Sequence, residues 1–269
     1  MDTRGLTQLA ELIYNHCGID YTNNLNSLDT KVNNRIKELG LSYWEYCGYL
    51  KVELSEWDVL MELITVNETY FYREENLLEE FRRKIQSEYK GRTLLNPLRI
   101  WCAACSSGEE PYTLGMIIEE LNCFQPGAVQ IIASDINKKV LKKAKSGLYN
   151  KNSFSFRKMP EGAIERFFLD QGGEYMVKPS IQSMVDFRFM NLLDKNIQYH
   201  MNNIDIIFCR NVLIYFDKKA IENIVNSFHG ILKPQGTLYL GHSETLSYIS
   251  HEFETVYTEN IFYYRKGDA

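Results

Sequence analysis

The fold is indicated most clearly by residues 98–122, LRIWCAACSSGEEPYTLGMIIEELN. It begins with a continuous apolar run, typical of a strand buried on both faces, and ends with the apolar spacing of a helix. Small residues join the two parts and let the backbone approach a ligand, and Pro111 suits the first turn of a helix. The stretch therefore predicts a strand, a loop and a helix, with a ligand site at the loop.

The chain beyond Pro97 repeats this alternation. Apolar runs typical of strands occur at VQIIASD (129–135), IDIIFCR (204–210) and GTLYLGH (236–242), with helical stretches between them. Strands that alternate with helices predict an α/β fold, in which a parallel sheet is covered on both faces. The tail FETVYTENIFYYRK (253–266) alternates like two half-exposed strands, so we expect an antiparallel pair at the sheet edge.

Residues 1–66 have a different pattern. Apolar residues recur at three- and four-residue steps, as in Leu9, Leu12 and Ile13, which is typical of a helical bundle. We expect three or four helices, separated by breaks at 17–18, 23–26 and 39–40. The sequence thus predicts a small N-terminal helical domain at 1–66 and a larger α/β domain at 67–269.

The connection from Leu148 to Asn196 is too long for a simple loop between a strand and a helix. It contains two candidate short strands, in GGEYMVKPS (172–180) and SMVDFRFMN (183–191). We expect it to form a small β-subdomain at about 168–190, inserted into the larger domain.

Composition narrows the class of protein. The chain is 45% hydrophobic and 24% charged, which is ordinary for a globular protein. Its net charge of −5 lies entirely in residues 1–66, with five basic and ten acidic side chains, and this disfavours nucleic-acid binding. We find neither the roughly 18 apolar residues of a membrane span nor a signal peptide, so we expect a cytoplasmic protein without membrane insertion.

The six cysteines are scattered, and reduced thiols are expected in the cytoplasm. Cys102 and Cys105 form a C-x-x-C pair in RIWCAAC (99–105), which we interpret as a buried strand running into a loop, and residues three apart on a strand point to opposite faces. With no second pair nearby, we expect packing here, and we predict no metal site.

Polar residues follow three of the predicted strands. Glu109 and Glu110 make the first loop anionic, which fits a cationic ligand, although such glutamates also suit a helix N-terminus. Asp135 ends the second strand, where it could accept ribose hydroxyls or cap a helix. Arg210 and Asn211 end another strand and should face the same cleft, or are ordinary turn residues. These positions together favour an adenosine ligand.

The chain resembles the chemotaxis-receptor methyltransferase family (CheR) over nearly its whole length. The resemblance rests on specific strings in the right order. They are NETYFYR (67–73), WCAACSSGEEPYT (101–113), SDI (134–136), NLL (191–193), CRNVLIYFD (209–217) and GHSE (241–244).

This resemblance implies a Rossmann-like class I methyltransferase sheet and S-adenosylmethionine as the cofactor, with S-adenosylhomocysteine as the product. It further implies transfer of the methyl group to glutamate carboxylates on the cytoplasmic helical bundle of chemoreceptors. A cofactor site is implied at Asn67, Thr69, Arg73, Glu109, Asp135, Asn191, Leu192, Arg210 and Asn211.

The resemblance also suggests individual roles. Asp135 would hold the ribose, and Glu109 would lie near the amino-acid end of the cofactor. Arg73 and Tyr215 are the implied catalytic residues, with Arg73 nearest the incoming carboxylate and Tyr215 orienting the acceptor. We expect a monomer. The alternatives are a methyltransferase of another protein or a small molecule, and a non-catalytic sensor of the cofactor.

Three further expectations concern individual segments. The stretch 168–175 is short for a β-subdomain that grips a receptor's C-terminal tether, which predicts a pentapeptide-independent enzyme. Lys31 and Arg35 share one helical face, with Lys37 nearby, as a possible receptor-docking face or a merely solvated one. His242 follows a strand, where a structural hydrogen bond is expected more than a catalytic role.

Overall fold

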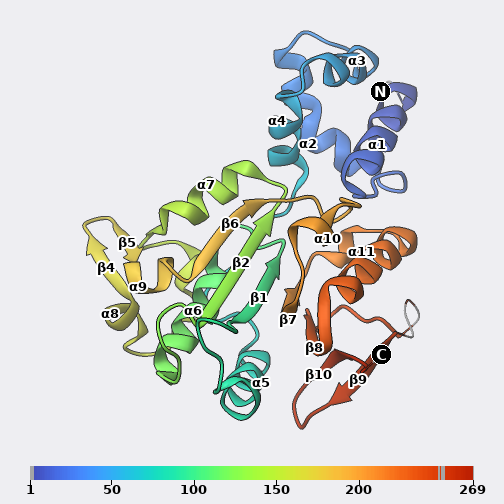
Figure 1. The fold of residues 1–269 in the computed structure, drawn as a ribbon. Helices are drawn as coiled ribbons and strands as arrows, with labels where there is room; N and C mark the ends of the chain where they lie inside the picture. Colours follow the sequence, from blue (N-terminus) through green and yellow to red (C-terminus); the bar gives the residue numbers. More distant parts are fainter. Residues whose placement is uncertain (1–2, 248, 250–251, 269) are drawn as a thin grey trace.

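The computed structural model describes residues 3–247, 249 and 252–268. Figure 1 shows a helical unit, drawn in blue, that stands on a larger α/β body. Among the described residues, no helix has both the length and the apolar character needed to cross a membrane.

The helical unit contains four helices with a hydrophobic core of their own. The predicted breaks at 17–18 and 23–26 both lie in the connection between the first and second helices, and the one at 39–40 separates the second from the third, whereas the break at 53–55 was not predicted. Asn24 caps the second helix by accepting a hydrogen bond from the backbone N–H of Ser27, and Ser42 and Glu45 form a reciprocal capping box at the start of the third. The helices are α1 (Thr3–Cys17), α2 (Leu25–Glu38), α3 (Tyr43–Val52) and α4 (Glu56–Ile64).

The body is built on a seven-stranded sheet in the order β6-β2-β1-β7-β8-β10-β9. The first five strands are parallel, whereas β9 and β10 are antiparallel to their neighbours at one edge, as predicted. The strands are β1 (Leu98–Ala103), β2 (Val129–Asp135), β6 (Val185–Phe189), β7 (Ile204–Cys209), β8 (Leu232–Leu240), β9 (Phe253–Tyr257) and β10 (Phe262–Lys266).

Helices cover both faces of this sheet (Figure 1). Ile100 and Cys102 of β1 face a core that includes α5 and α6, while Trp101 and Ala103 face a second core that includes α11. The alternation explains the continuous apolar run, because each face of the strand is buried. The helices are α5 (Glu75–Lys84), continued by a π-helical turn (Ile85–Tyr89), α6 (Glu109–Leu121), α7 (Lys138–Ser146), α10 (Ile197–His200) and α11 (Lys218–Ile231). The predicted α/β architecture is therefore confirmed.

The small β-subdomain differs from the prediction. It is a three-stranded antiparallel sheet in the order β3-β5-β4, and its third strand comes from residues before the expected segment. The predicted strand in 183–191 is instead β6, the parallel edge strand of the main sheet. The alternating pattern of these residues fits a strand of a small sheet and an edge strand of the main sheet equally well, since an edge strand is also half-exposed. The segment holds β3 (Leu148–Asn150), a 3-10 turn (Phe154–Phe156), α8 (Ala163–Phe167), β4 (Phe168–Gln171), β5 (Glu174–Val177) and α9 (Pro179–Gln182).

The expectation that Cys102 and Cys105 point to opposite faces is also wrong. β1 ends at Ala103, and Ala104 turns the chain with a positive φ of 60°, so Cys105 lies outside the strand. Both thiols are buried in the same core, and they are free. Burial raises the pKa of each thiol well above its usual range, which favours the inert, protonated form.

Candidate functional site

A deep cavity lies at the carboxyl ends of the parallel strands, beside the helical unit. It encloses about 1020 Å³, a volume that includes solvent at its open mouth. Parallel sheets bind ligands at this position, where the strand order reverses, which here occurs between β1 and β7. All but one of the residues predicted from the sequence line it, namely Asn67, Thr69, Arg73, Asp135, Asn191, Leu192, Arg210, Asn211 and Tyr215.

Three residues that line the cavity have a left-handed backbone although none of them is glycine. Ala104 and Ser106 in the loop after β1 have φ angles of 60° and 49°, and Asn211 after β7 has 58°. Each such conformation costs roughly 1–3 kcal/mol and tends to occur at functional sites. The loops around the cavity are thus shaped at the expense of local stability.

Asp135 ends β2 and fixes the loop after β1. Its carboxylate accepts the backbone N–H of Ser106 at 2.8 Å and that of Asn137 at 2.9 Å. Burial raises the pKa of Asp135, opposed by these backbone hydrogen bonds. Each oxygen takes one of the two bonds, so acceptor capacity remains for a ligand hydroxyl at the cavity wall.

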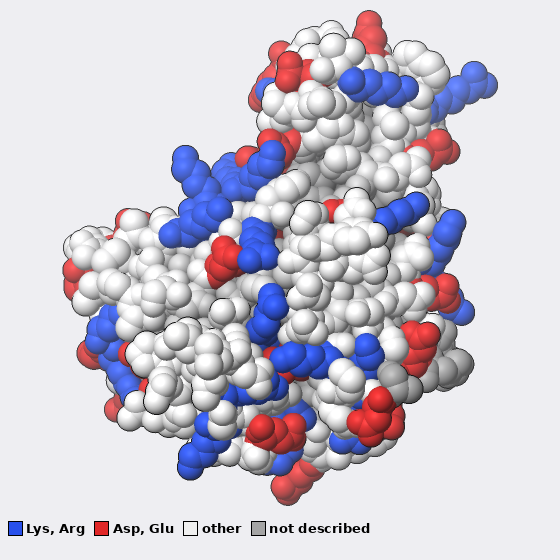
Figure 2. All heavy atoms as spheres, in the orientation of Figure 1, with Lys and Arg blue, Asp and Glu red and all other residues white. Residues whose placement is uncertain are grey.

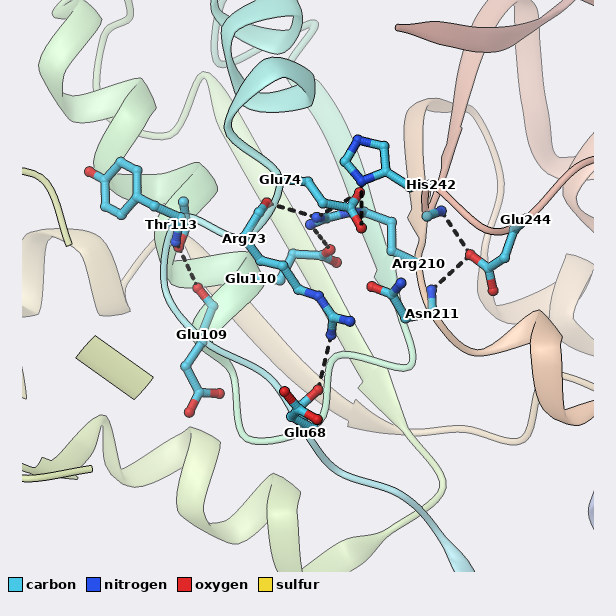
Figure 3. A network of polar contacts seen from close by, with 12 residues as sticks. Glu68, Arg73, Glu74, Glu109, Glu110, Thr113, Arg210, Asn211, His242 and Glu244 are labelled. Atoms are coloured by element: carbon cyan, nitrogen blue, oxygen red, sulfur yellow. Dashed lines mark hydrogen bonds and ion pairs between the residues drawn. The ribbon is translucent and has the colours of Figure 1, made fainter. Parts of the chain in front are cut away.

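Arg210 is the centre of a buried ion cluster (Figure 3). Its guanidinium lies 2.8 Å from Glu110 and 3.1 Å from Glu74, and it donates to the backbone carbonyl of Arg73 at 2.7 Å. Burial raises the pKa of Glu110, although Arg210 opposes this. Since two carboxylates surround one guanidinium, the cluster leaves an excess negative charge at the cavity wall, which suits a cationic ligand.

Arg73 and Tyr215 line the same cavity. Arg73 donates to the backbone carbonyl of Glu68 at 3.1 Å and lies 5.5 Å from the centre of the Tyr70 ring. Within the described part of the chain, no carboxylate forms an ion pair with Arg73. Burial raises the pKa of Tyr215, opposed by the charge of Arg73, so its hydroxyl stays protonated at neutral pH. The cavity therefore offers a free cation and a hydroxyl donor together.

The amide side chains of the site have different partners. Asn67 donates to Thr65, and Asn191 donates to the backbone carbonyl of His16 at 2.6 Å. The buried Oδ1 of Asn211 has no hydrogen-bond partner among the described residues. An unpaired buried acceptor is costly, and a ligand that donates a hydrogen bond there would remove that cost.

Glu109 differs from the sequence-based expectation. Its buried carboxylate accepts hydrogen bonds from the hydroxyls of Ser107 at 2.8 Å and Ser155 at 2.9 Å, and it does not line the cavity. Helical geometry explains the difference, because consecutive residues of α6 point about 100° apart. The acidic residue of the loop that lines the cavity is Glu110.

Sequence reasoning missed Glu244, which is buried and organises the loop after β7. Its two oxygens accept four backbone N–H groups, from Gly241, Asn211, Val212 and Leu213, at 2.7–2.9 Å. The string GHSE contained this residue, but nothing local in the sequence indicated its distant partners. His242 is mostly exposed, with its Nδ1 3.5 Å from Glu74.

Comparison with known proteins decides the family. The model of the CheR methyltransferase SAM-binding domain matches residues 67–262, and that of the CheR all-alpha domain matches residues 4–65. This chain belongs to the CheR methyltransferase family. It is a methyltransferase whose cofactor is S-adenosylmethionine.

Curated relatives agree with this assignment. The chain is 34% identical to a chemotaxis protein methyltransferase of Salmonella typhimurium, over 93% of this chain and 88% of that protein. It is 37% identical to chemotaxis protein methyltransferase 1 of Pseudomonas aeruginosa, over 77% of each. Among solved structures, the citrinin polyketide synthase CMeT domain aligns at a TM-score of 0.40 and 16% identity, over 61% of this chain and 34% of that one, too distant to inform function.

The cavity fits the cofactor of this family. S-adenosylmethionine carries a sulfonium, an ammonium, a carboxylate and ribose hydroxyls, so it has two cations to one anion and several hydrogen-bond donors. The carboxylates of Asp135 and Glu110 belong to residues that line the cavity, as does Asn211, whose buried Oδ1 is without a partner among the described residues. The donor set of the ligand therefore complements the acceptor set of the protein.

Proposed function

We propose that this CheR-family enzyme methylates glutamate side chains of chemotaxis receptors and forms glutamyl methyl esters. The observation that carries the proposal is Arg73, a cation without a carboxylate partner among the described residues, in the same cavity as Tyr215. An arginine in this state suits an incoming carboxylate. The names of the relatives, chemotaxis protein methyltransferases, support the receptor as the acceptor.

The chemistry needs no general base from the protein. The bound cofactor supplies an electrophilic methyl group on a sulfonium. A glutamate acceptor with a pKa near 4.3 is already ionised at neutral pH, so no proton has to be removed before attack. The task that remains for the protein is to align the carboxylate and exclude water.

We assign the following roles within this proposal. Asp135 accepts the ribose hydroxyls, and Glu110 with Asn211 receives the amino-acid end of the cofactor in place of Glu109. Asn67, Thr69, Asn191 and Leu192 complete the cofactor walls. Arg73 and Tyr215 orient the acceptor, and the excess negative charge around Arg210 balances the cofactor's positive charge.

We further propose that the enzyme acts as a cytoplasmic monomer on the receptor's helical bundle. In this view residues 1–66 form a domain of their own and 67–269 the catalytic domain. The docking face suggested by Lys31 and Arg35 has little support, because Arg35 is bound by Glu56 through two hydrogen bonds of 2.9 and 2.7 Å and Lys31 donates to the backbone carbonyl of Ile64. In Figure 2, basic side chains gather instead over α7.

The direct test incubates the enzyme with a purified receptor cytoplasmic fragment and cofactor labelled on the methyl group. We expect label that alkali releases, since methyl esters hydrolyse readily. The matched control is a receptor fragment whose acceptor glutamates are replaced by glutamine, and it should stay unlabelled. Alkali-stable label, or label on a small molecule alone, would support the other methyltransferase functions. Cofactor binding without product would indicate a sensor.

A further inference from the structure

The turn that joins α1 to α2, residues 17–20, lies against the catalytic body. We call it the α1 turn. Two loops that border the cavity contact the α1 turn or the last residues of α1. One is residues 191–193, which follow β6, and the other is residues 211–217, which follow β7. Both loops contribute residues to the cavity wall, as does the α1 turn itself.

The first loop is held by a hydrogen bond and by packing. Asn191, a proposed cofactor residue, donates its side-chain amide to the backbone carbonyl of His16 at 2.6 Å. Leu193 packs directly against Gly18. A displacement of the α1 turn would therefore move a wall of the cofactor site.

The second loop is held by three contacts. Ile19 pairs with Phe216 in an isolated antiparallel bridge, and the backbone N–H of Asp20 donates to the carbonyl of Tyr215 at 3.2 Å. The hydroxyl of Tyr14 donates to Asp217 at 2.9 Å, and Asp217 in turn caps α11. These contacts fix the backbone from the carbonyl group of Tyr215 to Asp217, directly after the Tyr215 side chain.

The α1 turn is itself anchored in the helical unit. The ring of His16 stacks on Trp57 of α4, with ring centres 3.9 Å apart and planes 10° apart. The thiol of Cys17 donates to the carbonyl of Ile13 in the helix before it. These contacts join the start of the turn to the helical unit.

Gly18 is the point of closest approach. It is buried, with a φ of +79°, and an added Cβ would lie 2.5 Å from Leu193 and 3.0 Å from Phe216. Those two residues belong to the two different loops. The end of the Leu193 side chain can turn away from an added methyl group, whereas the Phe216 ring has to give by a few tenths of an ångström. Phe216 follows Tyr215 directly, so this displacement reaches the loop that carries Tyr215, and a reaction that depends on alignment is slowed by it.

We propose that the α1 turn is a positioning element for methyl transfer, with Gly18 as its central residue. The helical unit sets the placement of the Tyr215 loop and of the Asn191 wall. It is therefore part of the catalytic apparatus in addition to any role in docking. The positioning itself does not depend on which acceptor is used, whereas the predicted effect on the acceptor step rests on the proposed function.

The test compares Gly18→Ala with Gly40→Ala in the full chain. Gly40 is a matched control because its φ is +67° and an added Cβ there meets nothing within 4 Å. Both variants introduce the same left-handed strain, and Gly18→Ala must in addition accommodate Leu193 and Phe216, so its unfolding midpoint should be the lower of the two. Gly18→Ala should lower kcat by about threefold to tenfold, and Gly40→Ala should not. Hydrogen exchange should quicken in 191–193 and 211–217 only in Gly18→Ala.

The outcomes separate the proposals. If Gly18→Ala matches Gly40→Ala in kcat, KM, S-adenosylhomocysteine affinity and exchange, the positioning role is overturned. If Gly18→Ala does not fold, Tyr14→Phe replaces it. That variant should lower kcat about threefold, as expected for one lost hydrogen bond, with unchanged S-adenosylhomocysteine affinity, and an unchanged kcat would overturn the role. If the wild type esterifies no receptor, the acceptor proposal fails, while affinity and exchange still decide the positioning.

Discussion

At the scale of single residues, the site is defined by groups whose burial changes their chemistry. Asp135 and Glu110 are carboxylates held at the cavity wall, and burial raises the pKa of both. They line the space proposed for a cationic ligand. Their ionisation therefore links cofactor binding to pH.

We predict that S-adenosylhomocysteine affinity falls as the pH is lowered, starting above the ordinary carboxyl range near about 4. Protonation removes the charge and an acceptor from Asp135.

The free energy of unfolding should change with pH in the opposite direction to the affinity. Because the pKa of each carboxyl is higher in the folded state, the folded state binds these protons more tightly than the unfolded state. The buried carboxylate charges therefore destabilise the folded state at neutral pH, and this destabilisation disappears as the pH falls through the folded pKa. Calorimetric titration with parallel unfolding measures both, and an affinity independent of pH down to about 5 would refute the prediction.

The Glu244 carboxylate holds the loop after β7, and replacing one of its oxygen atoms tests this role. In Glu244→Gln an amide NH2 replaces one carboxylate oxygen and leaves two backbone N–H groups without an acceptor. We expect a loss of about 2–5 kcal/mol in the free energy of unfolding, together with weaker cofactor binding. Denaturant unfolding and calorimetry measure these. Glu259→Gln, at an exposed position, is the control and should stay within about 0.5 kcal/mol. Equal stability of the two variants would contradict the role.

At the scale of elements, the β-subdomain is the part of the chain at which the family resemblance implies a receptor tether would bind. β4 and β5 have four residues each and are joined at Gly172 and Gly173, so the sheet is small. A tethering peptide that added a strand would gain few main-chain hydrogen bonds there.

We therefore predict that a receptor's C-terminal pentapeptide does not bind this enzyme with micromolar affinity. Titration of the peptide, followed by calorimetry, measures this. As a control, the methylation rates of two receptor fragments are compared, one with and one without the pentapeptide. We expect the two rates to be equal. Saturable micromolar binding of the peptide would contradict the prediction.

The elements also show how far sequence patterns reach. The strand from Leu98 and the helical character of residues 1–66 were predictable because hydrophobic periodicity is a local signal, whereas the break between α3 and α4 was not predicted. β6 was placed in the wrong sheet, since a half-exposed pattern does not specify its neighbour. Arg35 looked like a surface cation because Glu56, its partner, is distant in sequence. The choice between Glu109 and Glu110 required the rotation of α6, which a loop motif does not give.

At the scale of the whole molecule, the cavity belongs to both units of the chain. The sheet supplies the ends of β1, β2 and β7, and the helical unit supplies Cys17, Ile19 and Ile64. Ion pairs between Lys138 and Asp58 and between Lys139 and Glu62 join the units outside the cavity. Exposed pairs of this kind contribute little each, so the buried contacts at the cavity are the main link.

In the proposed reaction, the methyl group of S-adenosylmethionine is transferred to a glutamate carboxylate. The most direct measurement maps the modified residue by tandem mass spectrometry after incubation of the enzyme, the cofactor and a receptor cytoplasmic fragment. We expect methyl esters on glutamate side chains, and alkali should remove these esters. The Tyr215→Phe variant should give a reduced yield of them. Methylation at lysine, arginine or another nitrogen, stable to alkali, would contradict it.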